Sequence, residues 1–271
     1  MGQLDGMVAL VTGASRGIGE GIARRFAAEG AAVAVVARTE QQTDERLPGT
    51  IHDTVAAIEA AGGRAIAIAA DLSSPAARAG IVPAVEAALG PVDILVNNAA
   101  VTFFIPVEGF PEKRYRLMFE VQVRAPFELA QAVLPGMRAR RRGWVLNISS
   151  VAAVHPVGPP YAGMAAFGGT VYGMCKAALE RFSTGLAAEV HADGIAVNAL
   201  SPTLGVATPG VMFHGLIPEG SEGFAEPVEV MVEAALALCS GDPATLTGRI
   251  AYSQALLDEL GREPGPIEGS R

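Results

Sequence analysis

The sequence predicts an α/β protein with a doubly wound parallel sheet and helices on both faces. Short apolar runs of strand length alternate with helical patterns along the chain, and such alternation builds a parallel sheet. The chain has 271 residues, half of them hydrophobic, which is enough for one sizeable core. We therefore expect a single domain over residues 1–271.

The first expected strand, residues 7–12 (M-V-A-L-V-T), leads into the turn G-A-S-R-G-I-G and a helical pattern over residues 18–28. Gly13, Gly17 and Gly19 lack a Cβ, so the chain can turn tightly and a phosphate can approach the amides at the helix N-terminus. The spacing G-x-x-x-G-x-G differs from the G-x-G-x-x-G fingerprint, and glycine clusters alone are often plain turns. The strand–turn–helix context favours nucleotide binding.

Five further apolar runs complete the expected sheet, at residues 33–37, 65–69, 94–96, 144–148 and 195–200. In a doubly wound sheet, ligands bind beyond the carboxyl ends of the strands, where the strand order switches. The polar motifs of this chain follow such strand ends. We therefore expect one site at that edge.

Tyr172 and Lys176 (Y-G-M-C-K) share one face of a helix expected at residues 171–190, because they are four positions apart. Lys176 is one of only two lysines against eighteen arginines, which argues against generic surface charge. An ammonium at ~4 Å in a medium of effective dielectric ~20 favours a phenolate by up to ~4 kcal/mol. We expect Lys176 to lower the pKa of Tyr172 toward neutrality, where a proton donor works best. Such pairs also occur on ordinary solvated helices.

These motifs together resemble the short-chain dehydrogenase/reductase family. The resemblance is carried by T-G-A-S-R-G-I-G at 12–19, N-N-A at 97–99, Ser150 and Y-x-x-x-K at 172–176, and it spans about residues 5–252. It implies a Rossmann-type fold and hydride transfer between a nicotinamide and a carbonyl or secondary alcohol. It also implies Tyr172 as general acid/base and Lys176 as the cation that grips the nicotinamide ribose. Ser150 would donate to the substrate oxygen, with Ser149 as the fallback.

The choice of dinucleotide is expected to depend on the end of the second strand, V-V-A-R. An acidic residue there would accept the ribose hydroxyls of NAD, whereas Arg38 can pair with a 2′-phosphate and Arg16 can add a second guanidinium. We expect NADP(H) rather than NAD(H); the alternative is that Arg38 stacks on adenine or lies in solvent. The resemblance assigns Asp71 to the adenine amino group, although an Asp after a strand is often a turn former, and it lays Asn97 along the cofactor. The full expected set of cofactor residues is Gly13, Ser15, Arg16, Gly17, Ile18, Gly19, Arg38, Asp71, Leu72, Asn98, Ala99, Tyr172, Lys176 and Thr208.

The chain departs from the family pattern at two main places. Gln122 stands where the family usually has an asparagine that organises a water-mediated proton path, so it either preserves this relay or is a plain helix residue. With Gln122, the expected catalytic set is Ser150, Tyr172, Lys176 and Gln122. From Ser150 to Tyr172 is 22 residues rather than about a dozen, and the extra Gly- and Pro-rich stretch predicts a loop at the mouth of the site. Tyr161 lies nearer the usual spacing, but Ala165 stands where a lysine is required.

Two segments are expected on the substrate side, residues 150–172 and 203–226. Both are apolar with few charges, which suits a pocket wall or lid for a hydrophobic ketone or secondary alcohol. They could equally form subunit contacts. His155 could contact substrate, residues 41–50 could cover the adenosine end of the cofactor, and we expect the tail 261–271 to be loosely ordered.

Composition excludes several classes of function. A net charge of −8 argues against a nucleic-acid surface. No apolar run reaches membrane-spanning length, no signal peptide is evident, and two cysteines predict neither a disulfide framework nor a metal site. We expect a cytoplasmic protein, and the resemblance suggests a homotetramer or homodimer formed through the helices at 124–137 and 171–190. The alternatives are an NAD(P)-binding protein with little catalysis and, less in keeping with the chain's length, an epimerase or dehydratase.

Overall fold

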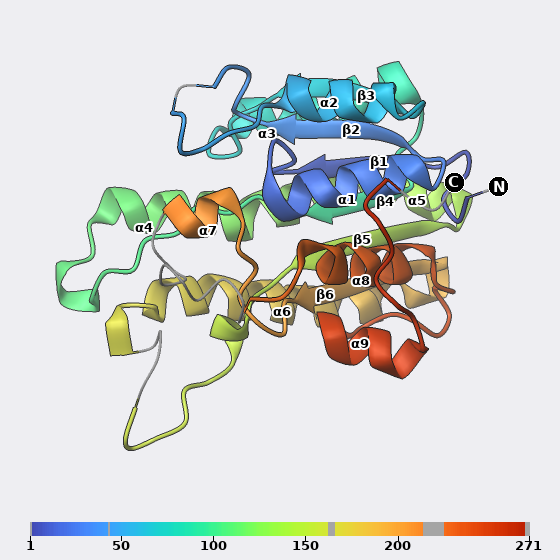
Figure 1. The fold of residues 1–271 in the computed structure, drawn as a ribbon. Coiled ribbons are helices and arrows are strands. Elements are labelled where there is room, and N and C mark those ends of the chain that lie inside the picture. The colour runs from blue at the N-terminus through green and yellow to red at the C-terminus, as the bar shows by residue number, and fades with distance from the viewer. Residues whose placement is uncertain (1, 43, 162–165, 214–224, 269–271) are drawn as a thin grey trace.

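A computed structural model describes residues 2–42, 44–161, 166–213 and 225–268 of the chain. At its centre lies a parallel sheet of seven strands in the order β3-β2-β1-β4-β5-β6-β7, with helices on both faces (Figure 1). The strands are β1 (Val8–Thr12), β2 (Ala32–Ala37), β3 (Arg64–Ala69), β4 (Ile94–Asn97), β5 (Gly143–Ile148), β6 (Ile195–Ser201) and β7 (Ile250–Tyr252). The doubly wound α/β fold predicted from the sequence is confirmed.

Each of the six predicted strands is present, with ends that differ by at most one residue from those expected. They were readable because parallel strands covered on both faces are continuous apolar runs. Alternate residues of β1 supply the two cores: Ala9 and Val11 face one, Val8 and Leu10 the other. The seventh strand, β7, was not predicted.

Helices cover the sheet in two layers. One core lies under α1 (Gly17–Ala28), α2 (Ile51–Ala60), α8 (Val228–Ser240) and α9 (Ser253–Leu260). The other lies under α3 (Pro75–Leu89), α5 (Ala125–Arg140) and α6 (Thr170–Val190). The remaining elements are the 3₁₀ helices η1 (Val107–Gly109), η3 (Val151–Ala153) and η5 (His191–Asp193), the π-helix η2 (Glu120–Arg124), α4 (Glu112–Phe119) and α7 (Pro209–Phe213).

The strand order switches between β1 and β4. β1 pairs with β2 on one side and with β4 on the other, so crossovers leave the sheet in opposite directions at this point. α4 and α7 extend beyond the carboxyl ends of the strands (Figure 1). The ends of β1 and β4 therefore open toward the segments expected to bind ligands.

The C-terminal segment contacts two helices of the fold. Residues 261–268 run from α9 past α8 to α1 (Figure 1). Arg25 Nη1 donates to the carbonyl oxygen of Pro266 at 2.7 Å, and Arg24 forms an ion pair with Glu268. Residues 261–268 therefore contact α1 through two arginines, and a loosely ordered tail stays a prediction; residues 269–271 lie outside the described part.

Several features bear on function class. In the described part of the chain, no helix is long and apolar enough to cross a bilayer. The described residues contain no group of three or more His, Cys, Asp or Glu side chains placed to hold a metal ion. Cys175 and Cys239 are buried free thiols, and burial raises the pKa of Cys175 to about 11.

Candidate active site

The glycine turn forms an open backbone cradle between β1 and α1. Gly13 and Gly17 have φ angles of +65° and +61°, a region that favours glycine. A Cβ on Gly13 would lie 2.8 Å from Cα of Ala99, and one on Gly17 would lie 3.1 Å from Cβ of Thr208. The first amides of any helix have no intrahelical partners. In α1, which begins at Gly17, the side chain of Arg16 does not cap them. The turn fits a phosphate group of a dinucleotide.

The end of β4 is fastened to this turn. Thr12 Oγ1 accepts from the backbone amides of Asn98 (3.0 Å) and Ala99 (3.2 Å). In return, Asn98 Nδ2 donates to the carbonyl oxygens of Thr12 (2.9 Å) and Gly13 (3.1 Å). The side-chain amide of Asn98 therefore holds the turn in shape.

Asn97 is the last residue of β4. Its side chain is buried, and Nδ2 donates to Asn147 Oδ1 on β5 at 2.8 Å. Asn147 Nδ2 in turn donates to Ser183 Oγ of α6 at 2.8 Å. Asn97 thus belongs to a chain of polar side chains inside the fold.

Ser150 and Tyr172 meet beyond the end of β5. Ser150 directly precedes η3 and is buried, and its Oγ accepts from the amide of Ala152 at 3.2 Å. Tyr172 lies in the first turn of α6 and is half-buried, and Ser150 lies near enough to act on its pKa. Two of the predicted catalytic groups are therefore close together.

Lys176 lies one turn further along α6 and is only 3% exposed. Its Nζ donates to the carbonyl oxygen of Ile148 at 2.8 Å and lies 5.6 Å from the centre of the Tyr172 ring. Burial lowers the pKa of Lys176 to about 8, although Cys175 and Glu180 act to raise it.

The expected effect of Lys176 on Tyr172 is wrong. Burial raises the pKa of Tyr172, Ser150 lowers it in part, and Cys175 adds to the rise. The ammonium of Lys176 is directed to Ile148, so loss of solvent outweighs the attraction that the sequence suggested. Tyr172 keeps its proton at neutral pH.

The two neighbouring serines have different partners. Ser149 Oγ donates to Glu180 Oε1 of α6 at 2.7 Å, whereas Ser150 meets Tyr172. Ser149, the fallback candidate, is thus committed to Glu180.

Gln122 lies in the π-helix η2 between α4 and α5 and is 1% exposed. Nε2 donates to the carbonyl oxygen of Val101 at 2.8 Å. Its Oε1 is buried with no hydrogen-bond partner among the described residues. An unpaired buried acceptor of this kind is a place for a water molecule or ligand donor.

An apolar wall that sequence reasoning missed stands beside Tyr172. Phe104 packs edge-on against the Tyr172 ring with centroids 5.8 Å apart, and Val101 and Phe103 join the cluster around Met118, Val171 and Cys175. The run V-T-F-F-I-P directly after N-N-A-A was the available signal. Its segment is tied to the end of the 150–172 insertion, because Ile105 N donates to Gly168 O at 3.2 Å.

The rest of that insertion is only partly described. His155 and Tyr161 are exposed, and nothing ties His155 to the candidate catalytic group. Ala165 lies outside the described residues, as do residues 214–224 of the second expected substrate segment. Within the described portion, Phe213 of α7 carries the guanidinium of Arg46 over its ring at 4.6 Å, so the 41–50 segment touches α7.

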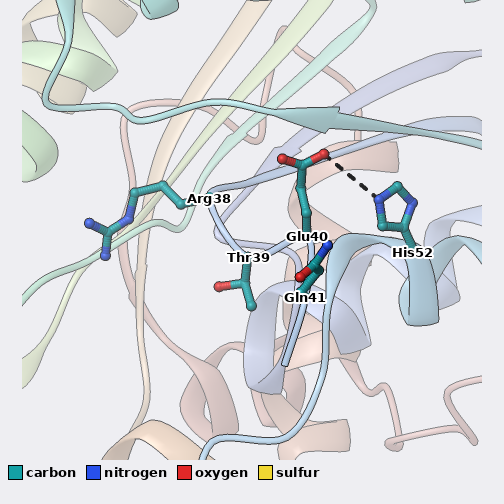
Figure 2. Close-up of a pocket in the computed structure, with 5 residues that line it drawn as sticks. All are labelled: Arg38, Thr39, Glu40, Gln41 and His52. Carbon is teal, nitrogen blue, oxygen red and sulfur yellow. Dashed lines mark ion pairs between the residues drawn. The ribbon is translucent and has the colours of Figure 1, made fainter. Parts of the chain in front are cut away.

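A pocket of about 490 Å³ lies at the end of β2, lined by Arg38, Thr39, Glu40, Gln41 and His52 (Figure 2). Glu40 Oε1 lies 4.0 Å from His52 Nε2, and Arg38 extends away from both (Figure 2). We expected no carboxylate at this strand end, but Glu40, two residues beyond Arg38, lines the same pocket. Glu40 and Arg38 therefore lie on opposite sides of the same pocket.

Asp71 lies near Arg38 but is already engaged. Its Oδ1 accepts from the amide (2.9 Å) and hydroxyl (2.8 Å) of Ser73. Burial acts to raise the pKa of Asp71, but the Ser73 hydrogen bonds and the charges of Arg38 and Arg78 outweigh it and leave the pKa lowered. Asp71 is therefore an ionised turn former close to the Arg38 guanidinium.

Arg16 has a different partner from the one predicted. Its Nε donates to Pro48 O at 3.0 Å and its Nη2 to Gly49 O at 2.8 Å. The guanidinium thus anchors the 41–50 segment to the glycine turn. Of the other expected cofactor residues, Ser15 and Leu72 are buried, Ile18 packs against the core, Gly19 lies buried in α1 and Thr208 lies against Gly17.

Comparison with known proteins adds to this geometry. The family model described as short chain dehydrogenase matches residues 7–213. A short chain dehydrogenase of Pseudocercospora fijiensis is 42% identical over 203 residues, which are 74% of this chain and 60% of that protein. Hydroxysteroid dehydrogenase-like protein 2 of Homo sapiens is 32% identical over 262 residues, which are 97% of this chain and 60% of that protein. The structure of a 3-oxoacyl (acyl-carrier-protein) reductase from Agrobacterium tumefaciens C58 with NADP bound has a TM-score of 0.77 and 30% identity, covering 92% of this chain and 93% of that one.

The chain spans about 60% of the length of these two curated relatives. The region matched by the family model contains the glycine turn, Ser150, Tyr172 and Lys176. The candidate site therefore lies wholly within the shared part.

Proposed function

This chain belongs to the short-chain dehydrogenase family, and we propose that it is an oxidoreductase that transfers hydride between NADP(H) and a hydrophobic carbonyl compound or secondary alcohol. The observation that carries the proposal is the grouping of Ser150, Tyr172 and the buried Lys176, whose Nζ lies 5.6 Å from the centre of the Tyr172 ring. This group lies at the carboxyl end of β5, which is separated from the glycine turn after β1 only by β4. Members of the family are oxidoreductases that act on CH–OH and C=O groups.

Tyr172 is the proton donor of the proposed reduction. Because burial raises its pKa, the phenol is protonated at neutral pH and can deliver its proton to the alkoxide that forms on a reduced carbonyl. Ser150, close to the same phenol, stabilises the negative charge that develops on the substrate oxygen. When bound, NADP(H) supplies or accepts the hydride.

Gln122 has the chemistry expected of a member of a proton path. Its Nε2 is held by Val101, which fixes the amide, while its buried Oε1 has no partner among the described residues. A water molecule bonded to Oε1 would satisfy the acceptor and give protons a route. Gln122 would then replace the family's asparagine with an amide on a longer stem.

The cofactor would be held by the turn between β1 and α1 and by the pocket at the end of β2. The open amides after Gly13 and the helix N-terminus suit the pyrophosphate. Arg38 would pair with the 2′-phosphate of NADP(H). Glu40 on the opposite side of the pocket supports the competing choice, NAD(H), since a carboxylate accepts ribose hydroxyls.

The apolar wall next to Tyr172 supports a hydrophobic substrate. Val101 and Phe103 pack in the cluster around Met118, Val171 and Cys175, and Phe104 packs against Tyr172. Aromatic and aliphatic side chains with few polar groups favour apolar ligands. The human relative carries the name hydroxysteroid dehydrogenase-like, which fits the same class of alcohol. Turnover restricted to sugars or small polyols in a ketone and alcohol panel would contradict this assignment.

A second candidate is an NAD(P)-binding protein with little catalysis, favoured by Gln122 in place of asparagine. Tyr172→Phe separates the two. Turnover of NADPH with a ketone, followed at 340 nm, should fall by ~10² or more because the proton donor is lost, while NADPH binding measured by titration should persist. Unchanged turnover would remove Tyr172 from the mechanism.

We extend the proposal to a homodimer or homotetramer and to a cytoplasmic location. Phe127 on α5 is 50% exposed, Met174 on α6 is 45% exposed, and Phe127 packs edge-on against Phe182 of α6. These side chains supply an apolar face suited to a two-fold interface. Light scattering after size exclusion tests the oligomeric state, and cell fractionation tests the location.

A further inference from the structure

Two hydrogen bonds connect α6 to the end of β5. Lys176 Nζ donates to the carbonyl oxygen of Ile148 at 2.8 Å, and Glu180 Oε1 accepts from Ser149 Oγ at 2.7 Å. Lys176 and Glu180 are four residues apart on one helix face, and their partners are consecutive residues. These two hydrogen bonds therefore fix the position of Ser150, the next residue, relative to Tyr172.

The hydrogen bond between Ser149 and Glu180 also brings a carboxylate near Lys176. Lys176 is buried and, among the described residues, forms no direct ion pair. Glu180 is half-buried one turn away. Burial lowers the pKa of Lys176, while Cys175 and then Glu180 act to raise it. Burial raises the pKa of Glu180, while the hydrogen bond from Ser149 and then the charge of Lys176 act to lower it. The two groups stabilise each other's ionised forms across one helical turn.

We propose that Glu180 is a positioning residue for the reaction assigned above: it holds Ser149, and through it Ser150, against α6, and it places a carboxylate one helical turn from the ammonium of Lys176. This inference rests on the proposed function only where it concerns turnover. The contacts and the mutual charge effect stand without it.

Few other titratable groups face this pair in the described structure. β5 and β6 contain none, because their sequences are G-W-V-L-N-I and I-A-V-N-A-L-S. On α6 itself, Tyr172 and Cys175 are the neighbours of Lys176. From β7, Tyr252 faces Glu180, and burial, with a smaller contribution from Glu180, raises the pKa of Tyr252. Glu120 and Arg124 of η2 pair with each other and with Arg78 and Glu128, and Tyr115 of α4 stacks on Phe119.

The chain permits a direct test because it contains only two lysines, Lys113 and Lys176. Biosynthetic labelling with ¹³Cε-lysine gives two NMR signals, assigned with Lys113→Arg. Their pH titrations report the protonation of each lysine without cofactor or substrate. Lys113 is exposed and serves as an internal reference.

Three variants divide the inference into its parts. Glu180→Gln removes the charge but keeps an oxygen that can accept from Ser149. Ser149→Ala removes the hydrogen bond but keeps the charge. Glu189→Gln, on an exposed position of the same helix, is the matched control.

In wild type, Lys176 should titrate near pH 8. Glu180→Gln should lower this midpoint by about half a unit or more, while Glu189→Gln and Lys113 should not change. An unchanged Lys176 midpoint in Glu180→Gln overturns the charge role. If Glu180→Gln does not fold, Glu180→Asp should fold and keep the wild-type midpoint, and a midpoint lowered in Glu180→Asp as well overturns the role.

Turnover provides the second readout. In Glu180→Gln the alkaline limb of kcat should move to lower pH by the same shift as the NMR midpoint. In Ser149→Ala kcat should fall severalfold with no shift of that limb, because Ser150 loses its support. Wild-type kcat in Ser149→Ala overturns the positioning role. If wild type turns over no carbonyl compound while Glu180→Gln still shifts the Lys176 midpoint, the proposed function fails and the charge coupling stands.

Discussion

Arg16 donates a hydrogen bond from Nη2 to the carbonyl oxygen of Gly49, 2.8 Å away, and so joins the glycine turn to the segment between β2 and α2. Its Nε makes a second bond to that segment, at Pro48. Thr54 Oγ1 on α2 adds a further link to Ala14 O of the turn at 2.9 Å. The 41–50 segment is therefore held against the expected phosphate site by Arg16, the arginine that we expected to bind a phosphate.

Arg16→Ala should weaken the binding of NADPH and of NADH by a similar factor. Loss of two hydrogen bonds frees the 41–50 segment and disturbs the turn, which both dinucleotides share, so we expect KM for NADPH and for NADH to rise together by about three- to tenfold. Steady-state kinetics with each cofactor measures this. A rise for NADPH alone would return Arg16 to a role at the 2′-phosphate.

Arg38→Ala should weaken the binding of NADPH but not that of NADH. The Arg38 side chain is exposed, so its removal should leave the fold intact. A charge-assisted bond to a phosphate contributes about 1.5–3 kcal/mol, which corresponds to a rise in KM for NADPH of about ten- to a hundredfold. KM for NADH should stay unchanged, and Glu40→Gln, on the opposite side of the pocket, should leave KM for NADPH within about twofold. A wild-type preference for NADH would refute the assignment of Arg38.

The sheet was predictable because strands that are buried on both faces are continuous apolar runs in the sequence. A run such as V-A-L-V-T can only be a covered strand or a buried helix segment, and the glycine turn after it decides for the strand. β7 escaped this reasoning because a three-residue strand, I-A-Y, is too short to show a pattern. Its position is set by pairing with β6, which is a tertiary property.

The arrangement of Tyr172 and Lys176 was predictable, but their electrostatics were not. Spacing brought Tyr172 and Lys176 to one helix face, as the structure has them, but the pKa of Tyr172 depends on how much solvent the surrounding fold removes. The direction of the Lys176 ammonium depends on the Ile148 carbonyl, which is 28 residues away in sequence. Arg16 and Glu40 show the same limit, since each is placed by a loop whose course the sequence did not specify.

Glu226 offers a test of how the substrate-side segment is held. Its Oε2 accepts from the amides of Thr203 (2.8 Å) and Leu204 (3.0 Å), and its Oε1 accepts from Ser253 Oγ (2.6 Å). The buried carboxylate thus joins the end of β6 to the start of α9. Glu226→Gln should destabilise the protein by about 2 kcal/mol, because its hydrogen bonds no longer have a charged acceptor and the NH₂ of the new side-chain amide faces another donor. Denaturant unfolding followed by Trp144 fluorescence measures this.

The same variant should raise KM for a ketone more than KM for NADPH, because the segment that begins at Thr203 borders the substrate side. Glu263→Gln is the matched control: Glu263 is exposed, and its stability should stay within about 0.5 kcal/mol of wild type. Equal stability of Glu226→Gln and Glu263→Gln would show that the carboxylate does not hold the segment.

Lys176→Met should lose activity yet gain stability at neutral pH. The pKa of Lys176 is lowered from 10.5 to about 8 by burial, which corresponds to about 3 kcal/mol of destabilisation while the amine is charged. Loss of the hydrogen bond to Ile148 offsets about 1–2 kcal/mol of the gain, so the net increase in unfolding free energy should be about 1–2 kcal/mol at pH 7. Because the folded-state pKa lies below that of the unfolded chain, wild type recovers this stability as pH rises from about 8 toward 10.5. The advantage of Lys176→Met should therefore shrink or reverse between pH 7 and pH 10 in denaturant unfolding, and an advantage that is equal at both pH values would show that Lys176 is not buried as a charged group.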